Sequence, residues 1–333
     1  MAMTSRERLR RLYCHEEMDR PAAIIRWWGF RDDPSYSELF KLMTEQADWE
    51  EPWDPFHLIH GGPEIDWRAV KRSGGGKDHP LKDVNDAEQL LSMPLQEIGG
   101  DVSSYFQLER KIGDRGIAIV NLGNNPAGHV ASLFGSEKFA ILSVDERDML
   151  HALMRHQQDV LLRLVDYLIS KGIVYFSIFG QEMIAPPLHG HDDFFDFNVR
   201  YDAAIAERIH ASGGRLNVHC HGRLKAVMDG FPAIGADVLH CFEAAPMGDV
   251  TPAEVKNAWR GRISLEGNIQ IADFYEKPPE AIRNQTQALI CDCFDDHRGF
   301  AVTPTASPFM PGRGRECYPQ YLAMLETVKA FNS

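Results

Sequence analysis

The sequence lacks any apolar run near 18 residues, the length that a membrane-spanning helix needs. Its opening residues also lack the short apolar stretch of a secretory signal peptide. Cysteine is scarce, with six residues in 333, and these are scattered rather than spaced as a disulfide framework or zinc knuckle. These absences argue against a membrane protein and a disulfide-stapled secreted domain, and we expect a protein of the reducing cytoplasm.

Basic residues are also in deficit. The chain has 35 Lys and Arg against 48 Asp and Glu, which gives a formal net charge of −13. Because phosphate backbones are bound by concentrated Lys and Arg, this balance argues against a nucleic-acid partner. The glycine-rich segment 71–77 lacks the residue order and the preceding buried strand of a phosphate-binding loop, so we predict a flexible hairpin or lid there.

No linker rich in Pro, Gly or Ser divides the chain, so we expect residues 1–333 to form one domain. What the sequence does contain is a series of short apolar runs rich in β-branched residues. Such runs are typical of a parallel sheet whose outer face is covered by helices. The candidate strands are 21–27, 55–60, 116–121, 173–179, 215–219, 236–240, 262–266 and 299–303.

Segments with helical periodicity separate several of these runs, for example residues 144–171, 193–212 and 223–235. Eight strands alternating with helices predict an α/β fold, a closed (β/α)8 (TIM) barrel, rather than an open doubly wound sheet. The first half is less regular, and we expect an irregular insertion near residues 60–100. An N-terminal helix that begins at Thr4 and Ser5 is expected to close the bottom of the barrel.

Ionisable residues gather after the predicted strands, at their C-terminal ends. In (β/α)8 barrels these ends converge on one pocket, where the active site lies. The residues are Glu182 after the fourth strand, His219-Cys220-His221-Gly222 after the fifth, His240-Cys241-Phe242-Glu243 after the sixth and Glu266-Gly267-Asn268 after the seventh.

His219 and His221 are the sharpest signal in the sequence. Residues two apart on a strand point the same way, so both imidazoles are expected in the barrel mouth, with Cys220 facing the surrounding helices. Imidazole suits Zn, Cu, Fe or Ni, and a carboxylate from Glu182 or Glu243 would complete a site with one open position. The alternative is that the histidines hydrogen-bond the substrate or buried carboxylates without a metal.

Glu182 and Glu243 are candidate catalytic residues because both follow strands on the active face. A structural role is also open, in which Glu182 pairs with Arg26 or Arg223. Cys241 is expected to be a packed thiol, because neighbouring residues on a strand face opposite sides.

Four further residues are candidates for the substrate pocket: Trp27 and Trp28 after the first strand, and Glu266 and Asn268 after the seventh. Large aromatic side chains also serve as core or lid packing. That alternative stays open for both tryptophans.

Taken together, several segments resemble the uroporphyrinogen decarboxylase superfamily, and within it the methyltransferase-like branch rather than the decarboxylases. The resemblance covers nearly the whole chain and implies a (β/α)8 barrel, in agreement with the strand count. It is carried by Arg6-Glu7-Arg8, Asp19-Arg20-Pro21, Asn217-Val218-His219-Cys220-His221-Gly222, Gly235-Ala236-Asp237-Val238-Leu239, Glu266-Gly267-Asn268-Ile269 and Gly299-Phe300-Ala301-Val302-Thr303-Pro304.

The resemblance implies a zinc ion held by a His-x-Cys pair and a later Cys, beside a corrinoid. His219 matches the family's His, but His221 stands in place of the Cys, and the later Cys, expected at Ala306, is missing. Two imidazoles with carboxylates form a harder site than two thiolates and favour an oxygen or nitrogen substrate over a thiol. Residues 26–31 do not match the arginine-bearing motif with which the decarboxylases hold their substrate.

We therefore predict a metal-dependent methyltransferase or demethylase for a small methylated substrate, with zinc held by His219, His221 and a carboxylate such as Glu182. The methyl group would pass to a corrinoid protein or a tetrahydrofolate-like carrier. One alternative is a metal-independent decarboxylase or lyase that uses Glu182 and a histidine for acid–base chemistry. Another is a non-catalytic barrel that binds a corrinoid or tetrapyrrole. A homodimer is expected from the resemblance alone.

Overall fold

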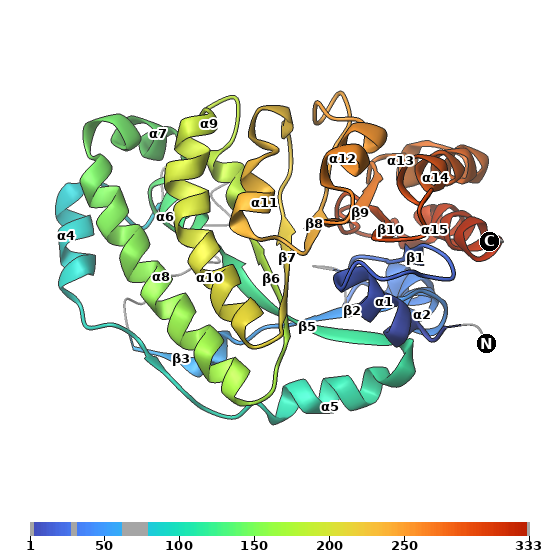
Figure 1. Ribbon diagram of the computed structural model, residues 1–333, viewed down its shortest axis with the longest axis horizontal. Coiled ribbons are helices and arrows are strands. Elements are labelled where there is room, and N and C mark those ends of the chain that lie inside the picture. The colour runs from blue at the N-terminus through green and yellow to red at the C-terminus, as the bar shows by residue number, and fades with distance from the viewer. Residues whose placement is uncertain (1–2, 28–31, 62–78, 332–333) are drawn as a thin grey trace.

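The structure, a computed structural model, describes residues 3–27, 32–61 and 79–331. The predictions for Trp28 and for the glycine-rich segment 71–77 therefore lie outside the described residues. The centre of the molecule is an eight-stranded sheet in the order β1-β10-β9-β8-β7-β6-β5-β2 (Figure 1). Its strands are β1 (Ala22–Ala23), β2 (Trp49–Trp53), β5 (Gly116–Asn124), β6 (Tyr175–Phe179), β7 (Arg215–His219), β8 (Val238–His240), β9 (Ser264–Ile269) and β10 (Phe300–Pro304).

Every pairing in this sheet is parallel, and β1 near one end of the chain pairs with β10 near the other. The two halves of the sequence therefore build one sheet. Helices cover its outer face, as parallel strands joined by crossover helices require (Figure 1). The predicted (β/α)8 barrel is confirmed.

Asp48 joins the two edge strands, β1 and β2, between which the described residues form no strand ladder. Its backbone N–H donates to the Ala23 carbonyl over 2.8 Å, and its carboxylate accepts from the Ala23 N–H over 2.8 Å. Arg8 and Arg20 donate to the same carboxylate at 2.6 and 2.8 Å. Burial raises the pKa of Asp48, but the two arginines outweigh it and the net pKa is lowered, so a buried ionised aspartate closes the barrel.

The predicted strand at 55–60 is wrong. Residues Phe56–Leu58 form a 3-10 turn (η2), and Ile59–His60 (β3) pairs antiparallel with Glu97–Ile98 (β4) in a separate two-stranded sheet. The second barrel strand is instead β2, at Trp49–Trp53, which pairs with β5.

β2 was not predicted because its sequence has two glutamates and a proline between two tryptophans. A strand covered on both faces normally reads as an apolar run. The charges are accommodated here by partners: Glu50 lies 3.4 Å from Arg26, and Glu51 accepts a hydrogen bond of 2.8 Å from the Trp49 indole.

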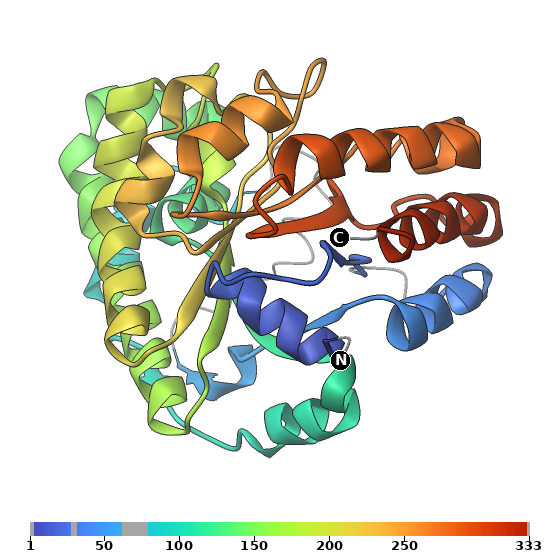
Figure 2. The ribbon, with the colours of Figure 1, turned by 45° about the vertical axis from the view of Figure 1, so that its right-hand side comes forward.

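The predicted helix over 144–171 is confirmed as α8, which begins at Arg147. Val144, at the start of the predicted range, belongs to α7 and is 80% exposed. The insertion near 60–100 contributes α4, and within the described residues no helix is long and apolar enough to cross a membrane. Figure 2 shows α14, α15 and α2 side by side on one side of the barrel. The main helices are α1 (Ser5–Tyr13), α2 (Ser37–Gln46), α4 (Val84–Ser92), α5 (Ser103–Ile112), α6 (Pro126–Phe134), α7 (Ser136–Asp145), α8 (Arg147–Ser170), α10 (Arg200–Ala211), α11 (Gly230–Ile234), α12 (Pro252–Trp259), α14 (Pro279–Cys293) and α15 (Gly314–Lys329).

The lower interior of the barrel holds a polar network, which α1 closes as the sequence predicted. The Thr4 side chain caps α1, and Tyr13 at the end of this helix donates a hydrogen bond to Glu50. Arg26 forms ion pairs with Glu50 and Glu266. Charged groups from several strands are thus paired inside the barrel, and we name Tyr13, Arg26, Glu50, Asn217 and Glu266 the interior network.

Candidate metal and active site

Three neighbouring strands, β7, β8 and β9, deliver polar residues to the mouth of the barrel. The parallel register sets His219 opposite His240, and His240 opposite Glu266. The chain then leaves β7 through Cys220 and His221, and leaves β8 through Cys241, Phe242 and Glu243. Because adjacent parallel strands end side by side, these two exits bring their side chains together.

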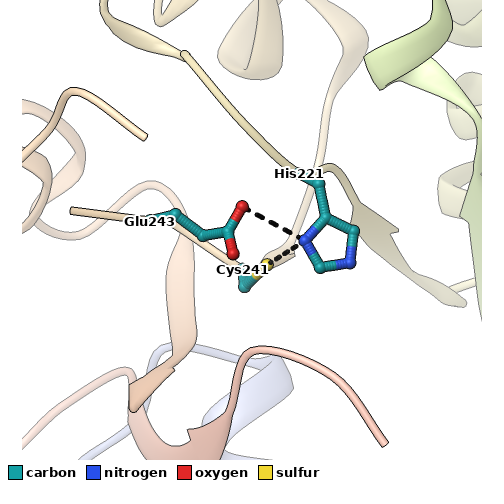
Figure 3. Close-up of side chains that lie close together, drawn as sticks. All are labelled: His221, Cys241 and Glu243. Atoms are coloured by element: carbon teal, nitrogen blue, oxygen red, sulfur yellow. Dashed lines mark hydrogen bonds and ion pairs between the residues drawn. The ribbon is translucent and has the colours of Figure 1, made fainter. Parts of the chain in front are cut away.

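His221, Cys241 and Glu243 form a compact group of three donors, with all ligand atoms within 4.8 Å of one another (Figure 3). His221 Nδ1 lies 3.3 Å from Cys241 Sγ and 3.2 Å from Glu243 Oε2. A tetrahedral zinc ion with ligands at about 2.1 Å (nitrogen, oxygen) and about 2.3 Å (sulfur) separates those ligands by roughly 3.4–3.6 Å. The two separations from His221 Nδ1 therefore lie close to the spacing that such an ion needs.

Glu243 is held in place from two further sides. The Gly222 N–H donates to Oε2 over 2.8 Å, and the Gln270 amide donates to Oε1 over 3.3 Å. Burial raises the pKa of Glu243, but the hydrogen bonds from His221 and Gly222 and the charge of His221 outweigh it, so the net pKa is lowered. The carboxylate is ionised and oriented before any ligand arrives.

His221 and Cys241 differ in exposure and in charge. The His221 side chain is 36% exposed, whereas Cys241 is fully buried. Burial lowers the pKa of His221, but the hydrogen bond and charge of Glu243, with that of Glu182, raise it overall. Burial and the same carboxylates raise the pKa of the Cys241 thiol, so a metal ion would have to displace its proton.

Glu182 stands beside this group on the short helix η4 (Gln181–Ile184), which follows β6. The Gly180 N–H donates to its Oε2 over 3.2 Å. Burial raises the pKa of Glu182, and the charges of His221 and Glu243 both act on it, which places it near them. A carboxyl group with a raised pKa is a candidate general acid.

The predicted histidine pair does come together, because the His219 and His221 ring centroids are 4.6 Å apart. His219, however, is hydrogen-bonded through Nδ1 to His240 Nδ1, at 2.6 Å. Of the predicted metal ligands, His221 belongs to the group of three donors and Glu243 joins it. His219 and Glu182 lie outside that group.

Cys241 was expected to be a packed thiol, yet its sulfur lies against His221. The alternation of side chains that suggested packing applies only within a strand, and β8 ends at His240. The signal in the sequence was its place one residue beyond the strand that neighbours β7. Cys220, the neighbour of both histidines, is fully buried as expected.

The predicted pocket residues that the structure describes are Trp27, Glu266 and Asn268. Trp27 is 4% exposed and packs against the rings of Tyr36 and Phe40. This agrees with the alternative in which the Trp27 side chain belongs to the core rather than to the pocket. Glu266 is fully buried in the interior network. Asn268 is half-buried, and its amide donates to the Phe242 carbonyl over 2.5 Å.

An open cleft of about 370 Å³ adjoins the site. It lies between the loops that follow β6, β7 and β8, and Gly222 places it next to His221. Its size suits a small molecule. The lining residues are Pro186, Pro187, Gly222, Arg223, Pro246 and Met247.

The family described as uroporphyrinogen decarboxylase (URO-D) matches residues 78–307, which is more than half of the chain. The resemblance inferred from the motifs is therefore confirmed at the level of the family. No curated protein matches the chain.

Among solved structures, a methyltransferase from Methanosarcina mazei has a TM-score of 0.67 and 13% identity, with 98% of this chain and 99% of that chain covered. At this identity the likeness establishes the shared fold. A B12-independent methionine synthase from Shewanella sp. W3-18-1, in complex with selenomethionine, has a TM-score of 0.43 and 13% identity over 76% of this chain and 68% of that chain, too low to carry an argument.

Proposed function

The chain belongs to the uroporphyrinogen decarboxylase family, and we propose that it is a metal-dependent methyltransferase or demethylase for a small methylated substrate. The observation that carries the proposal is the convergence of His221, Cys241 and Glu243 at the barrel mouth. One nitrogen, one sulfur and one oxygen donor favour zinc, which accepts all three. The fold shared with a methyltransferase supports the reaction class.

The donor set also suits the charge of the ion. A Cys241 thiolate and a Glu243 carboxylate would balance a divalent cation, and neutral His221 would be the third ligand. Zinc so held would supply a Lewis acid with a fourth position open to the substrate. The thiolate makes this site softer than the two imidazoles expected from the sequence.

Glu182 provides the proton in this proposal. When the methyl group leaves for the carrier, its bond to the substrate heteroatom breaks and the electron pair stays on that heteroatom. Glu182, whose pKa is raised by burial, would donate a proton there. The substrate would enter by the cleft beside Gly222, and the acceptor would be a corrinoid protein or a tetrahydrofolate-like carrier.

The six cysteines are all unpaired, which supports the proposal of a reducing, cytoplasmic location. The homodimer and the identity of the carrier stay predictions.

A metal-independent lyase is the second candidate. Glu182 with its raised pKa and the His221–Glu243 ion pair could move protons without a metal ion. A requirement for metal separates the two candidates.

The test is the metal content of untagged protein, measured by elemental analysis after loading with zinc and desalting. We expect about one zinc per chain in the wild type, lost in His221→Ala, Cys241→Ser and Glu243→Gln. Cys293→Ala, which removes a buried thiol of α14 outside the site, is the matched control and should retain the metal. His219→Ala decides whether this histidine is also a ligand.

Cobalt loading gives a second readout, since a Co–thiolate bond produces a charge-transfer band in the near ultraviolet. We expect the band in the wild type and in Cys293→Ala, and its absence in Cys241→Ser. A wild type that binds no metal after loading would contradict the proposal and favour the metal-independent lyase.

A further inference from the structure

Arg223 brings a positive charge to the cleft that adjoins the candidate metal site. The other described residues that line this cleft carry no charge: Pro186, Pro187, Gly222, Pro246 and Met247. Proline has no backbone N–H to donate, and the thioether side chain of Met247 is 59% exposed. Among the residues that the structure describes, the cleft therefore combines largely apolar walls with one guanidinium group.

The charge of Arg223 is not balanced within the described part of the chain. Its side chain is exposed and forms no hydrogen bond or ion pair with any described residue. Acidic residues that follow it in the sequence are engaged elsewhere: Asp249 accepts from the Lys225 N–H over 3.0 Å, and Glu254 pairs with Lys225 Nζ at 3.0 Å. Because arginine stays protonated at any physiological pH, this charge is available to a ligand.

Gly222 connects this charge to the candidate metal site. Its backbone N–H donates to Glu243 Oε2 over 2.8 Å, and its φ of 89° lies in the left-handed region that favours glycine. A Cβ added at Gly222 would have nothing within 4 Å, so the absent side chain leaves open space in the cleft. A ligand that fills the cleft at Gly222 therefore lies beside the two residues that flank it in the sequence, His221 and Arg223.

We propose that Arg223 binds a carboxylate of the substrate, which makes the substrate a small methylated carboxylic acid with an apolar body. A guanidinium donates two parallel hydrogen bonds to a carboxylate, and one cation balances its single charge. A phosphate monoester carries about −1.5 to −2 charges at pH 7, and the ionised Glu243 carboxylate disfavours the additional charge. The inference rests on the proposed function in calling this ligand the substrate, whereas binding of the carboxylate does not require the metal.

The test compares two probes of nearly the same shape, para-methoxybenzoate and its uncharged amide, para-methoxybenzamide. Their dissociation constants are measured by ligand-observed NMR titration on the full chain, freed of metal with a chelator because a metal ion could itself bind the carboxylate. We expect the wild type to bind the carboxylate about 10–100-fold more tightly than the amide, as for hydrogen bonds between charged groups. Equal affinity for the two probes, or no binding of the carboxylate, would overturn the proposal.

Variants at Arg223 test whether this residue causes the preference. Arg223→Gln should weaken binding of the carboxylate about 10–100-fold and leave the amide unchanged. Arg223→Lys keeps the charge but not the paired donors, so we expect an intermediate loss. Arg262→Gln is the matched control, because Arg262 is also exposed and without a partner among the described residues, but precedes β9 and so lies at the opposite end of the strands. Wild-type affinity of Arg223→Gln for the carboxylate would contradict the proposal.

Met247→Ser tests whether the carboxylate binds inside the cleft. The loss of the thioether side chain should weaken both probes alike, about 3–10-fold, because the apolar contact does not depend on the charge of the ligand. If Met247→Ser binds both probes as the wild type does, the carboxylate lies outside the cleft and the proposal is wrong.

Metal content separates this inference from the proposed function. A preference for the carboxylate that depends on Arg223, in a protein that binds no zinc after loading, would support the carboxylate site and contradict the proposed function. Zinc binding by a wild type that does not distinguish the carboxylate from the amide would do the reverse.

Discussion

The interior network and the barrel mouth use similar side chains in opposite ways. In the interior, Arg26 lies between the carboxylates of Glu50 and Glu266, and Asn217 donates to Glu266 over 3.0 Å. These groups are all buried. At the mouth, three donors surround a single point, and one of them, His221, is partly open to solvent.

This difference separates a structural charge from a functional one. A buried ion pair whose partners come from facing strands is sealed, and its removal is felt mainly as instability. At the mouth, His221 balances the Glu243 carboxylate and the Cys241 thiol has a raised pKa, so a metal ion would bind by displacing protons. The same barrel thus holds a filled polar core below and a ligand site above.

The largest effect is expected when the interior network loses its cation. Arg26→Met leaves two buried carboxylates, Glu50 and Glu266, without an opposite charge, and should destabilise the protein by about 3–5 kcal/mol. Denaturation with urea measures the free energy of unfolding. The control is Arg208→Met, which breaks an exposed ion pair with Asp166 and should cost less than about 1 kcal/mol. Equal losses of unfolding free energy in both variants would show that buried and exposed ion pairs do not differ in their contribution to stability here.

A buried carboxylate whose partners among the described residues are amides provides an intermediate case. Asp202 is fully buried, accepts from the Gln181 amide over 2.8 Å and from the Asn125 amide over 2.9 Å, and burial raises its pKa from 3.8 to about 7. The folded state keeps a proton that the unfolded state releases between these pH values. Stability from this group is therefore present below pH 4 and is lost as the pH rises toward 7, by roughly 4 kcal/mol.

Asp202→Asn should remove this dependence, because asparagine resembles the protonated acid. We expect the stability of the wild type, relative to the variant, to fall between pH 4 and pH 7 in urea titrations. A constant difference across that range would mean that Asp202 is ionised when folded, and that amides alone hold a buried charge.

The strands could be predicted wherever a buried strand reads as an apolar run, as β5 and β10 do. β2 could not, because Glu50 and Glu51 are tolerated only through partners that the fold supplies. At the site, the spacing of His219 and His221 placed both at the mouth. The direction of Cys241 depends on the path of the chain beyond β8, which no local pattern encodes.

Trp27 tests whether a tryptophan next to the mouth belongs to the core or to the pocket. Trp27→Phe keeps an aromatic ring against Tyr36 and Phe40 but shortens it, and should cost about 1–2 kcal/mol of stability. Zinc content, measured by elemental analysis, should stay at the wild-type level. If the variant keeps full stability but loses zinc, Trp27 contributes to the pocket rather than to the core.

Glu243→Gln should give the smallest change in the metal-free protein and the sharpest contrast once zinc is added. Glutamine keeps an oxygen that can accept from the Gly222 N–H, so we expect a loss of about 1 kcal/mol or less without metal. Zinc at 100 times its dissociation constant should stabilise the wild type by about 2.7 kcal/mol, and the variant, which loses the anionic ligand, by far less. Thermal unfolding with and without zinc measures both values. If the variant is strongly destabilised without metal, Glu243 acts like Glu266, as a structural charge, and the mouth is not a site preorganised for a cation.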